Sequence, residues 1–259
     1  MIKNFFNKYI EIITIIFLLL FWQMIGYLGL LPKFIIPTPL EILNAFLRDY
    51  KELIFHSKVT IIEAILGLIC GIVIAVVLSI FMDLFKTLNR AIYPVLIISQ
   101  TIPTVALAPI LVLWLGYDMT PKIVLITLTT TFPIVISMLD GFRNVDKDTI
   151  NLLRVMGANK LQILYHLKLP ASLSYFYAGL RVSVSYSFIA AVVSEWLGGF
   201  EGLGVYMIRS KKLFQYDTMF AIIILISFIS IFSMYLVKVS EKKIITWKYI
   251  GENNEKNNL

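Results

Sequence analysis

The sequence predicts an all-α membrane protein with six transmembrane helices. Hydrophobic residues make up 59% of the 259 residues and charged residues only 15%, and the mean hydropathy is +0.84. A soluble domain needs a largely polar surface, so a chain of this composition belongs in a bilayer. Polar, basic segments separate a series of long apolar runs, which is typical of a chain that crosses the membrane several times.

Five apolar windows are each about eighteen residues or longer, which is enough to cross about 30 Å of hydrocarbon. They cover residues 10–31, 59–82, 91–115, 122–139 and 219–237. The first window is too long for a signal peptide and has no small-residue cleavage site. We therefore expect it to be a retained span.

A sixth window, residues 176–197, is less apolar because it contains Arg181, Glu195 and several serines. Charged side chains are costly in hydrocarbon, whereas small and hydroxyl residues let helices approach closely or line a polar cavity. We expect this helix to lie inside the bundle rather than to face lipid on all sides.

The basic residues predict the orientation of the bundle. With both termini in the cytoplasm, fourteen Lys and Arg residues fall on the inner side and eight on the outer side, which agrees with the positive-inside rule. The basic cluster at 209–212 is an exception to this rule. The segment 140–175 is then cytoplasmic.

This orientation divides the chain into three parts. Residues 1–58 form an N-terminal span and an external short helix, and residues 59–237 form a core of five spans with a cytoplasmic loop at 141–175. Residues 238–259 form a cytoplasmic polar tail.

The sequence lacks the motifs that are typical of several other classes of protein. The net charge of +7 comes from short clusters between apolar runs, which argues against nucleic-acid binding. A phosphate-binding loop needs glycine followed by lysine, and none of the thirteen glycines is followed by lysine. The His-Glu-x-x-His and Gly-x-Ser-x-Gly motifs are also missing. We therefore expect that this chain is not itself an enzyme and that it binds no metal and no cofactor. Its one cysteine, Cys70, cannot form an intrachain disulfide.

Two short helices are predicted outside the membrane. Thr38, Pro39 and Glu41 form a capping box with proline at the first helical position, so a helix should begin here. The glycine-rich stretch 195–208 should end in a short helix through Lys212. The pattern leaves open whether that stretch is a re-entrant element or an ordinary surface loop.

The cytoplasmic segment predicts two short helices that meet at an angle. Asp148 can cap a first helix that ends near Met156, because Gly157 is the residue type that ends helices most easily. Asn159 and Gln162 form a second capping pair, for a helix that should run to about Lys168, before Pro170. The segment could be gripped by a soluble partner, or it could be an amphipathic connector that lies on the inner leaflet.

The spacing of residues in this segment resembles a known motif, which favours docking on a soluble partner. Gly157 is followed by nine residues, Leu167, one residue and Leu169-Pro170, which resembles the EAA loop of bacterial binding-protein-dependent ABC importer permeases. In that pattern Glu-Ala-Ala is followed by three residues, Gly, nine residues and Ile-x-Leu-Pro. Here Asn151, Leu152 and Leu153 replace Glu-Ala-Ala, and Leu167 replaces Ile. The resemblance implies that the segment contacts an ATPase subunit through the following residues: Asn151, Leu152, Leu153, Met156, Gly157, Ala158, Leu161, Leu164, Leu167 and Pro170.

The resemblance continues through most of the chain. The fragments IPTP (36–39), QTIPTVALAPILVLWLG (100–116), FPIVISMLDGFRNVD (132–146) and AGLRVSVSYSFIAAVVSEWLGGFEGLG (178–204) are similar to the branch of the family for nitrate, sulfonates, taurine and thiamine-precursor pyrimidines. It implies a type I permease fold in a bacterial cytoplasmic membrane, a second permease copy, two ATPase subunits that bind ATP-Mg, and an external solute-binding protein.

A solute pathway would need polar or helix-breaking residues at membrane depth. The candidates are Pro103, Pro109, Thr130, Arg181, Ser183, Ser187, Ser194 and Glu195. Other roles remain open: kinked packing for the prolines, structural hydrogen bonds or ion pairs for Glu195 and Glu63, and snorkelling for Arg181. An ion-coupled secondary transporter that works without an ATPase, or a membrane-embedded scaffold or enzyme, are the alternative functions.

Overall fold

The computed structural model describes residues 2–29 and 36–246, and this part of the chain is helical without strands. In chain order the helices are α1 (Ile2–Tyr27), α2 (Pro39–Arg48), α3 (Tyr50–Leu84), α4 (Lys86–Thr101), α5 (Thr104–Leu115), α6 (Met119–Arg143), α7 (Lys147–Val155), α8 (Lys160–Ile163), the π-helical turn η1 (Leu164–Lys168), α9 (Leu169–Gly198), α10 (Leu203–Lys212) and α11 (Tyr216–Ile244). The all-α prediction is confirmed.

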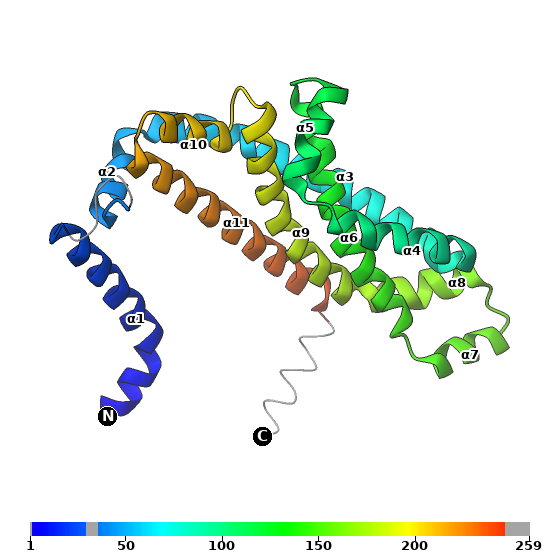
Figure 1. The fold of residues 1–259 in the computed structure, drawn as a ribbon. Helices are drawn as coiled ribbons and strands as arrows, with labels where there is room; N and C mark the ends of the chain where they lie inside the picture. Colours follow the sequence, from blue (N-terminus) through cyan, green and yellow to red (C-terminus); the bar gives the residue numbers. More distant parts are fainter. Residues whose placement is uncertain (1, 30–35, 247–259) are drawn as a thin grey trace.

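The centre of the fold is the packing of α6 against α3 and α9, with α11 on the other side of α9 (Figure 1). Small residues allow this close approach. A Cβ atom at Gly179 on α9 would lie 2.7 Å from the carbonyl oxygen of Pro133 on α6. The Ser183 hydroxyl donates to the Thr130 carbonyl oxygen across the same contact at 2.7 Å. Such contacts leave no room for larger side chains between these helices.

Four helical stretches in the described residues are long and apolar enough to span a membrane: Tyr50–Leu84, Met119–Arg143, Lys160–Gly198 and Tyr216–Ile244. The pair α4 and α5 makes a fifth if the bent pair is one span. The apolar part of α1, Ile13–Tyr27, is shorter. In Figure 1 α1 lies apart from the bundle, beside α2. The expected count of six spans is therefore matched only approximately.

The window 91–115 is interrupted at Pro103, one of the two prolines predicted from the sequence to be helix-breaking. It divides into α4 and α5, whose axes are bent by 101°. Ile102 between them is extended, with φ −80° and ψ 121°, because the ring of Pro103 disfavours a helical conformation in the residue before it. Pro109, by contrast, lies inside α5 without ending it.

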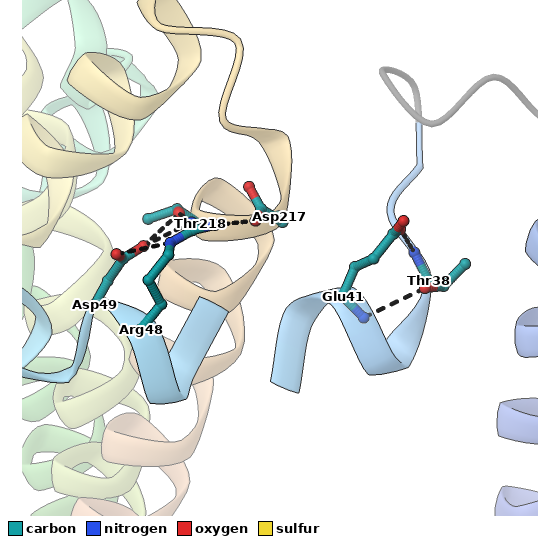
Figure 2. Close-up of polar contacts among 6 residues, drawn as sticks. All are labelled: Thr38, Glu41, Arg48, Asp49, Asp217 and Thr218. Atoms are coloured by element: carbon teal, nitrogen blue, oxygen red, sulfur yellow. Dashed lines mark hydrogen bonds and ion pairs between the residues drawn. The ribbon is translucent and has the colours of Figure 1, made fainter. Parts of the chain in front are cut away.

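The two ends of the bundle differ (Figure 1). The segment α7–α8 lies at one end, whereas α2, α10 and the loop before α10 lie at the other. At that second end the capping box of α2 is confirmed: the Thr38 N–H donates to Glu41 Oε2 at 2.8 Å and the Glu41 N–H donates to Thr38 Oγ1 at 3.3 Å (Figure 2).

A polar corner connects α2 and α3 to the start of α11 (Figure 2). Arg48 pairs with Asp49 at 2.9 Å and with Asp217 at 3.0 Å, and the Thr218 hydroxyl donates to Asp49 at 2.7 Å. The hydrogen bond from Arg48 lowers the pKa of the Asp49 carboxyl group. The corner fixes where α11 begins.

The C-terminal part differs from the predicted polar tail at 238–259. Helix α11 continues to Ile244, and Ile245 is fully buried in the core. Glu241 is also buried and pairs with Arg181 on α9. Residues 238–246 are therefore packed on the bundle. The rest of the expected tail, 247–259, lies outside the described residues.

Candidate functional site

The turn at Gly157 is built as the sequence predicts. The N–H groups of Gly157 and Ala158 donate to the carbonyl oxygens of Arg154 and Leu153, at 3.0 and 2.9 Å. This is the Schellman arrangement that ends a helix with a left-handed residue. Gly157 has φ +88°, which only glycine adopts at low cost.

The caps on either side of this turn are partly as expected. The reciprocal capping pair of Asn159 and Gln162 is confirmed, with both hydrogen bonds at 2.8 Å. The N-cap of α7 is Asp146 and not Asp148, since the Asp146 carboxylate accepts from the N–H groups of Asp148 and Thr149 at 3.2 and 3.0 Å. Asp148 lies in the first turn of the helix instead.

The Gly157 turn exposes a group of apolar side chains. These residues, called the apolar tip below, are Leu152, Val155, Met156 and Leu161, with exposed fractions of 60%, 86%, 73% and 60%. Of the other predicted contact residues, Asn151 and Pro170 are exposed, Leu153, Ala158 and Leu167 are half-buried, and Leu164 is buried. An exposed apolar cluster of this kind marks an interaction surface.

The second helix of the segment does not end before Pro170. Residues 160–198 form one continuous helical stretch, which contains the π-helical turn Leu164–Lys168. Proline is tolerated near such a turn because it has no N–H to donate and the local register of hydrogen bonds has already changed. The apolar tip is therefore directly attached to α9, one of the central helices.

Basic side chains surround the base of the segment. Lys168 in η1 pairs with Asp83 at the end of α3, at 2.6 and 2.7 Å to the two carboxylate oxygens. A cavity of about 140 Å³ beside this pair is also lined by Lys86, Arg154 and Lys160. The arrangement connects the segment to both α3 and α9.

A second cavity, called the α4–α5 cavity below, opens where α4 and α5 are bent apart. Its volume is about 290 Å³. It is lined by Gln100, Ile102, Pro103, Thr104, Thr129, Tyr186, Ile189 and Ala190. Because none of these side chains is charged, the cavity offers neutral hydrogen-bonding groups and an aromatic ring.

A family model described as the binding-protein-dependent transport system inner membrane component matches residues 67–246. The chain belongs to this family. It is 37% identical over 214 residues to a probable ABC transporter permease protein of Haemophilus influenzae, covering 83% of this chain and 87% of the relative. It is 35% identical to the formylaminopyrimidine transport permease protein ThiX of Halalkalibacterium halodurans, covering 83% of this chain and 86% of the relative.

The fold of this permease agrees with solved ABC importer structures. The structure described as inward facing conformations of the MetNI methionine ABC transporter aligns with a TM-score of 0.60. The alignment covers 73% of this chain and 92% of that chain at 18% sequence identity. The chain therefore has the type I ABC importer permease fold and is a membrane-embedded transport component.

Most of the residues predicted to line a pathway are packed between helices of the permease. Pro103 does line the α4–α5 cavity. Five others are almost fully buried, with exposed fractions of 0–3%: Thr130, Ser183, Ser187, Ser194 and Glu195. Pro109 is exposed on α5 but does not line this cavity.

Arg181 is held by a carboxylate rather than directed at a cavity. Its guanidinium pairs with Glu241 near the end of α11. The charge of Arg181 is therefore paired with a buried carboxylate within the protein.

A buried polar network, called the α10 cluster below, joins α3, α6 and α9 to the start of α10. Glu195 on α9 accepts from the Thr60 hydroxyl at 2.6 Å and from the Gly204 N–H at 2.5 Å. Glu63 on α3 pairs with Lys122 on α6 at 2.6 Å. The structural role considered for Glu195 and Glu63 is thus present in the fold.

Backbone groups of the loop before α10 complete this cluster. The N–H groups of Gly202 and Leu203 donate to His56 Nδ1 and to Thr60 Oγ1, at 3.0 and 2.8 Å. Tyr206 stacks on His56 with ring centroids 5.0 Å apart, and burial raises the pKa of Tyr206 to about 12. The glycine-rich stretch is therefore a packed element and not an ordinary surface loop, and the predicted helix through Lys212 is confirmed.

Sequence reasoning missed several residues. Lys122 is one of the eight basic residues that the orientation prediction places on the outer side, although it is only 5% exposed and is buried against Glu63. Gln100, Thr104 and Tyr186 line the α4–α5 cavity but were not chosen. A polar Gln100 three residues before the helix-breaking Pro103 was the available signal, whereas nothing local distinguishes Tyr186 from the other aromatic residues.

Proposed function

We propose that this permease subunit carries a small neutral heterocyclic solute, such as a thiamine-precursor pyrimidine, across the membrane. An external binding protein delivers the solute, and separate ATPase subunits drive transport. The single observation that most directly supports ATPase-driven transport is the apolar tip at Gly157. Its four exposed apolar residues are joined without a break to the central helix α9.

The apolar tip suits a protein partner. Three side chains at 60–73% exposure and Val155 at 86% cannot bury their apolar surface within this chain. The rigid caps on both sides keep the tip in one shape, which reduces the entropy lost on docking. A movement of the docked tip would pass to α9 through residues 160–168 and to α3 through the Lys168–Asp83 pair, and would shift the bundle between outward- and inward-open states.

The α4–α5 cavity supports a neutral solute over the anionic candidates, which are sulfonate, nitrate and taurine. An anion at membrane depth would need a cation to replace its hydration, but the lining residues are uncharged and Arg181 is paired with Glu241. Tyr186 can stack on a flat ring, and Gln100 and Thr104 can donate and accept hydrogen bonds. Thr129 can accept, since its hydroxyl donates to carbonyl oxygens of its own helix. The name of the ThiX relative points to the same class of solute.

The assembly that we propose has two copies of this permease and two ATPases, with both termini in the cytoplasm. Helix α4 has no buried residue in the single chain, so a second copy could cover it and enclose a shared pathway. In this orientation α1 is the first span, α2 is external, and the loop 141–175 faces the ATPases.

Reconstitution tests this function. The permease, with the ATPase and binding protein that co-purify from its native membrane, is placed in vesicles, and uptake of radiolabelled formylaminopyrimidine and taurine is compared. We expect ATP-dependent uptake of the pyrimidine and little uptake of taurine. Uptake of taurine alone would contradict the solute, and the absence of any ATPase contacting residues 147–168 would contradict the mechanism.

The ion-coupled alternative is tested in the same vesicles. The permease alone receives a proton or sodium gradient without ATP. We expect no solute accumulation, since the family and the relatives are parts of ABC transporters. Gradient-driven accumulation by this chain alone would replace the proposal.

A further inference from the structure

Two buried carboxyl groups belong to the α10 cluster. Glu63 on α3 and Glu195 on α9 are each 1% exposed. Thr60, whose hydroxyl donates to Glu195, lies one helical turn before Glu63 on α3, which brings the two carboxyl groups to the same part of the cluster. Oε1 of Glu63 accepts from Lys122, and both oxygens of Glu195 accept from Thr60 and Gly204. Oε2 of Glu63 has no donor among the protein groups described.

The charges in this cluster do not balance if both acids are ionised. Two carboxylates would carry two negative charges against the one positive charge of Lys122. An uncompensated charge buried in a membrane bundle is strongly disfavoured. One proton held between the two carboxyl groups makes the cluster neutral and supplies the missing donor to Oε2 of Glu63.

We propose that Glu63 and Glu195 form a proton-binding site that holds one shared proton, and that this proton keeps the start of α10 docked on α3 and α9. The pair then resembles other closely spaced carboxyl groups that cannot both ionise. No bond other than the O–H···O hydrogen bond is made or broken.

The site acts on α10 through Glu195. This carboxyl group accepts from the Gly204 N–H in the first turn of α10. A side chain at Gly202 would collide with it, and Gly202 has φ +118°, so the loop is fitted closely around the Glu195 side chain. Removal of the shared proton would make the two carboxylates repel each other and weaken the hold of Glu195 on the loop.

Other charged groups near the pair are few. Lys122 faces it from α6. His56 lies one turn before Thr60 on α3, and Glu52, Arg209 and Glu201 act on that histidine rather than directly on the pair. His56 Nδ1 accepts from the Gly202 N–H, so the neutral form of this histidine is the one that holds the loop. The carboxyl pair is therefore the group in the cluster that would gain or lose the proton.

Two substitutions separate a shared proton from simple packing. In Glu63→Gln the amide can donate to Glu195 and accept from Lys122, so it imitates the protonated acid without a titratable proton. In Glu195→Gln the amide oxygen can accept from the Gly204 N–H only if the NH₂ group faces Thr60, whose hydroxyl must then donate to the His56 carbonyl oxygen and no longer to residue 195. We expect E63Q to unfold at the same temperature as the wild type and E195Q to unfold at a lower one.

The direct test is infrared spectroscopy of the full chain in lipid vesicles at neutral pH. We expect the carbonyl stretching band of a buried protonated carboxylic acid in the wild type, and its loss in both E63Q and E195Q. Glu201→Gln, in the same loop but outside the pair, should leave the band unchanged. A wild type without this band, or a band that persists in both variants, would overturn the proposal.

A nitroxide label reports on the loop itself. It is attached at Phe200→Cys in a Cys70→Ser background, since Phe200 is 76% exposed. We expect the label to become more mobile as pH rises above neutral in the Glu63 protein and to be independent of pH in E63Q. Equal pH dependence in both backgrounds would refute the control of α10 by the shared proton.

Discussion

Lys168 and Asp83 form a doubly hydrogen-bonded ion pair, with Nζ 2.6 and 2.7 Å from the two carboxylate oxygens, between η1 and the end of α3. Both side chains are mostly buried, with exposed fractions of 19% and 17%. Because 85 positions separate the two residues, the pair is a tertiary connection between the segment that carries the apolar tip and a central helix.

Asp83→Asn should lower the free energy of unfolding by about 1–3 kcal/mol, the typical cost of leaving a charged hydrogen-bonding group without its partner. Thermal unfolding of the purified protein measures this. Asp140→Asn is the matched control, because its pair with Arg143 is 3.8 Å long and half exposed, and we expect a change of at most about 0.5 kcal/mol. Equal losses of stability in the two variants would show that the Lys168–Asp83 pair contributes no more than an exposed ion pair.

Gly157→Val should uncouple transport from ATP hydrolysis while insertion into the membrane stays normal. A β-branched residue at φ +88° costs about 1–3 kcal/mol, so the Schellman turn shifts and the apolar tip changes its angle to α9. Stimulation of the ATPase by the loaded binding protein measures the effect.

Gly116→Val is the control for backbone strain, since Gly116 has φ +85° and, like Gly157, has no atom within 4 Å of the position of a Cβ. We expect it to retain coupling because Gly116 lies after α5, away from the segment. If Gly157→Val transports at the normal rate, the coupling role of this turn is wrong.

Local chemistry made the turns and caps predictable. Thr38 with Glu41, Asn159 with Gln162, and Gly157 all specify their structures through residues within a few positions, and each is confirmed. The bend at Ile102–Pro103 follows from an equally local rule, but hydropathy alone treated the window 91–115 as one span.

Contacts between distant residues could not be read in this way. Glu63 and Lys122 are 59 positions apart. From the sequence, Lys122 is therefore interpreted as a charge in an external loop, although in the fold it is buried as the partner of Glu63. The rotation of each helix was also unknown. Ser187 is buried between helices whereas its neighbour Tyr186 lines the cavity, because one position along a helix changes the direction of the side chain by about 100°. In a helix that is apolar on most sides, hydropathy does not fix this rotation.

Substitutions in the α4–α5 cavity and at a buried serine should affect the KM for solute differently. Gln100→Leu and Thr129→Val remove hydrogen-bonding groups from the α4–α5 cavity, so we expect a raised KM for solute with little change in basal ATP hydrolysis. Ser183→Ala removes only a packing hydrogen bond to the Thr130 carbonyl oxygen and should leave KM unchanged. Uptake kinetics in vesicles measure all three variants. A change in KM for Ser183→Ala alone would favour the pathway predicted from sequence.

The N-cap of α7 should make the segment sensitive to acid. The hydrogen bond from the Thr149 hydroxyl, together with the backbone N–H groups of Thr149 and Asp148, lowers the pKa of Asp146. A carboxyl group whose pKa is lower in the folded state stabilises that state above its unfolded pKa of about 3.9. The stabilisation is lost as pH falls from there through the lower folded value.

Amide hydrogen exchange of residues 147–156, corrected for the intrinsic effect of pH, measures this sensitivity. We expect faster exchange in acid for the wild type. Asp146→Ala should exchange faster at every pH, because the first N–H groups of α7 lose their acceptor. Asp146→Asn should keep a neutral acceptor and lose the pH dependence, while Asp148→Asn, which leaves the N-cap in place, should behave as the wild type. If Asp146→Ala exchanges like the wild type, α7 is held by its apolar contacts and not by its cap.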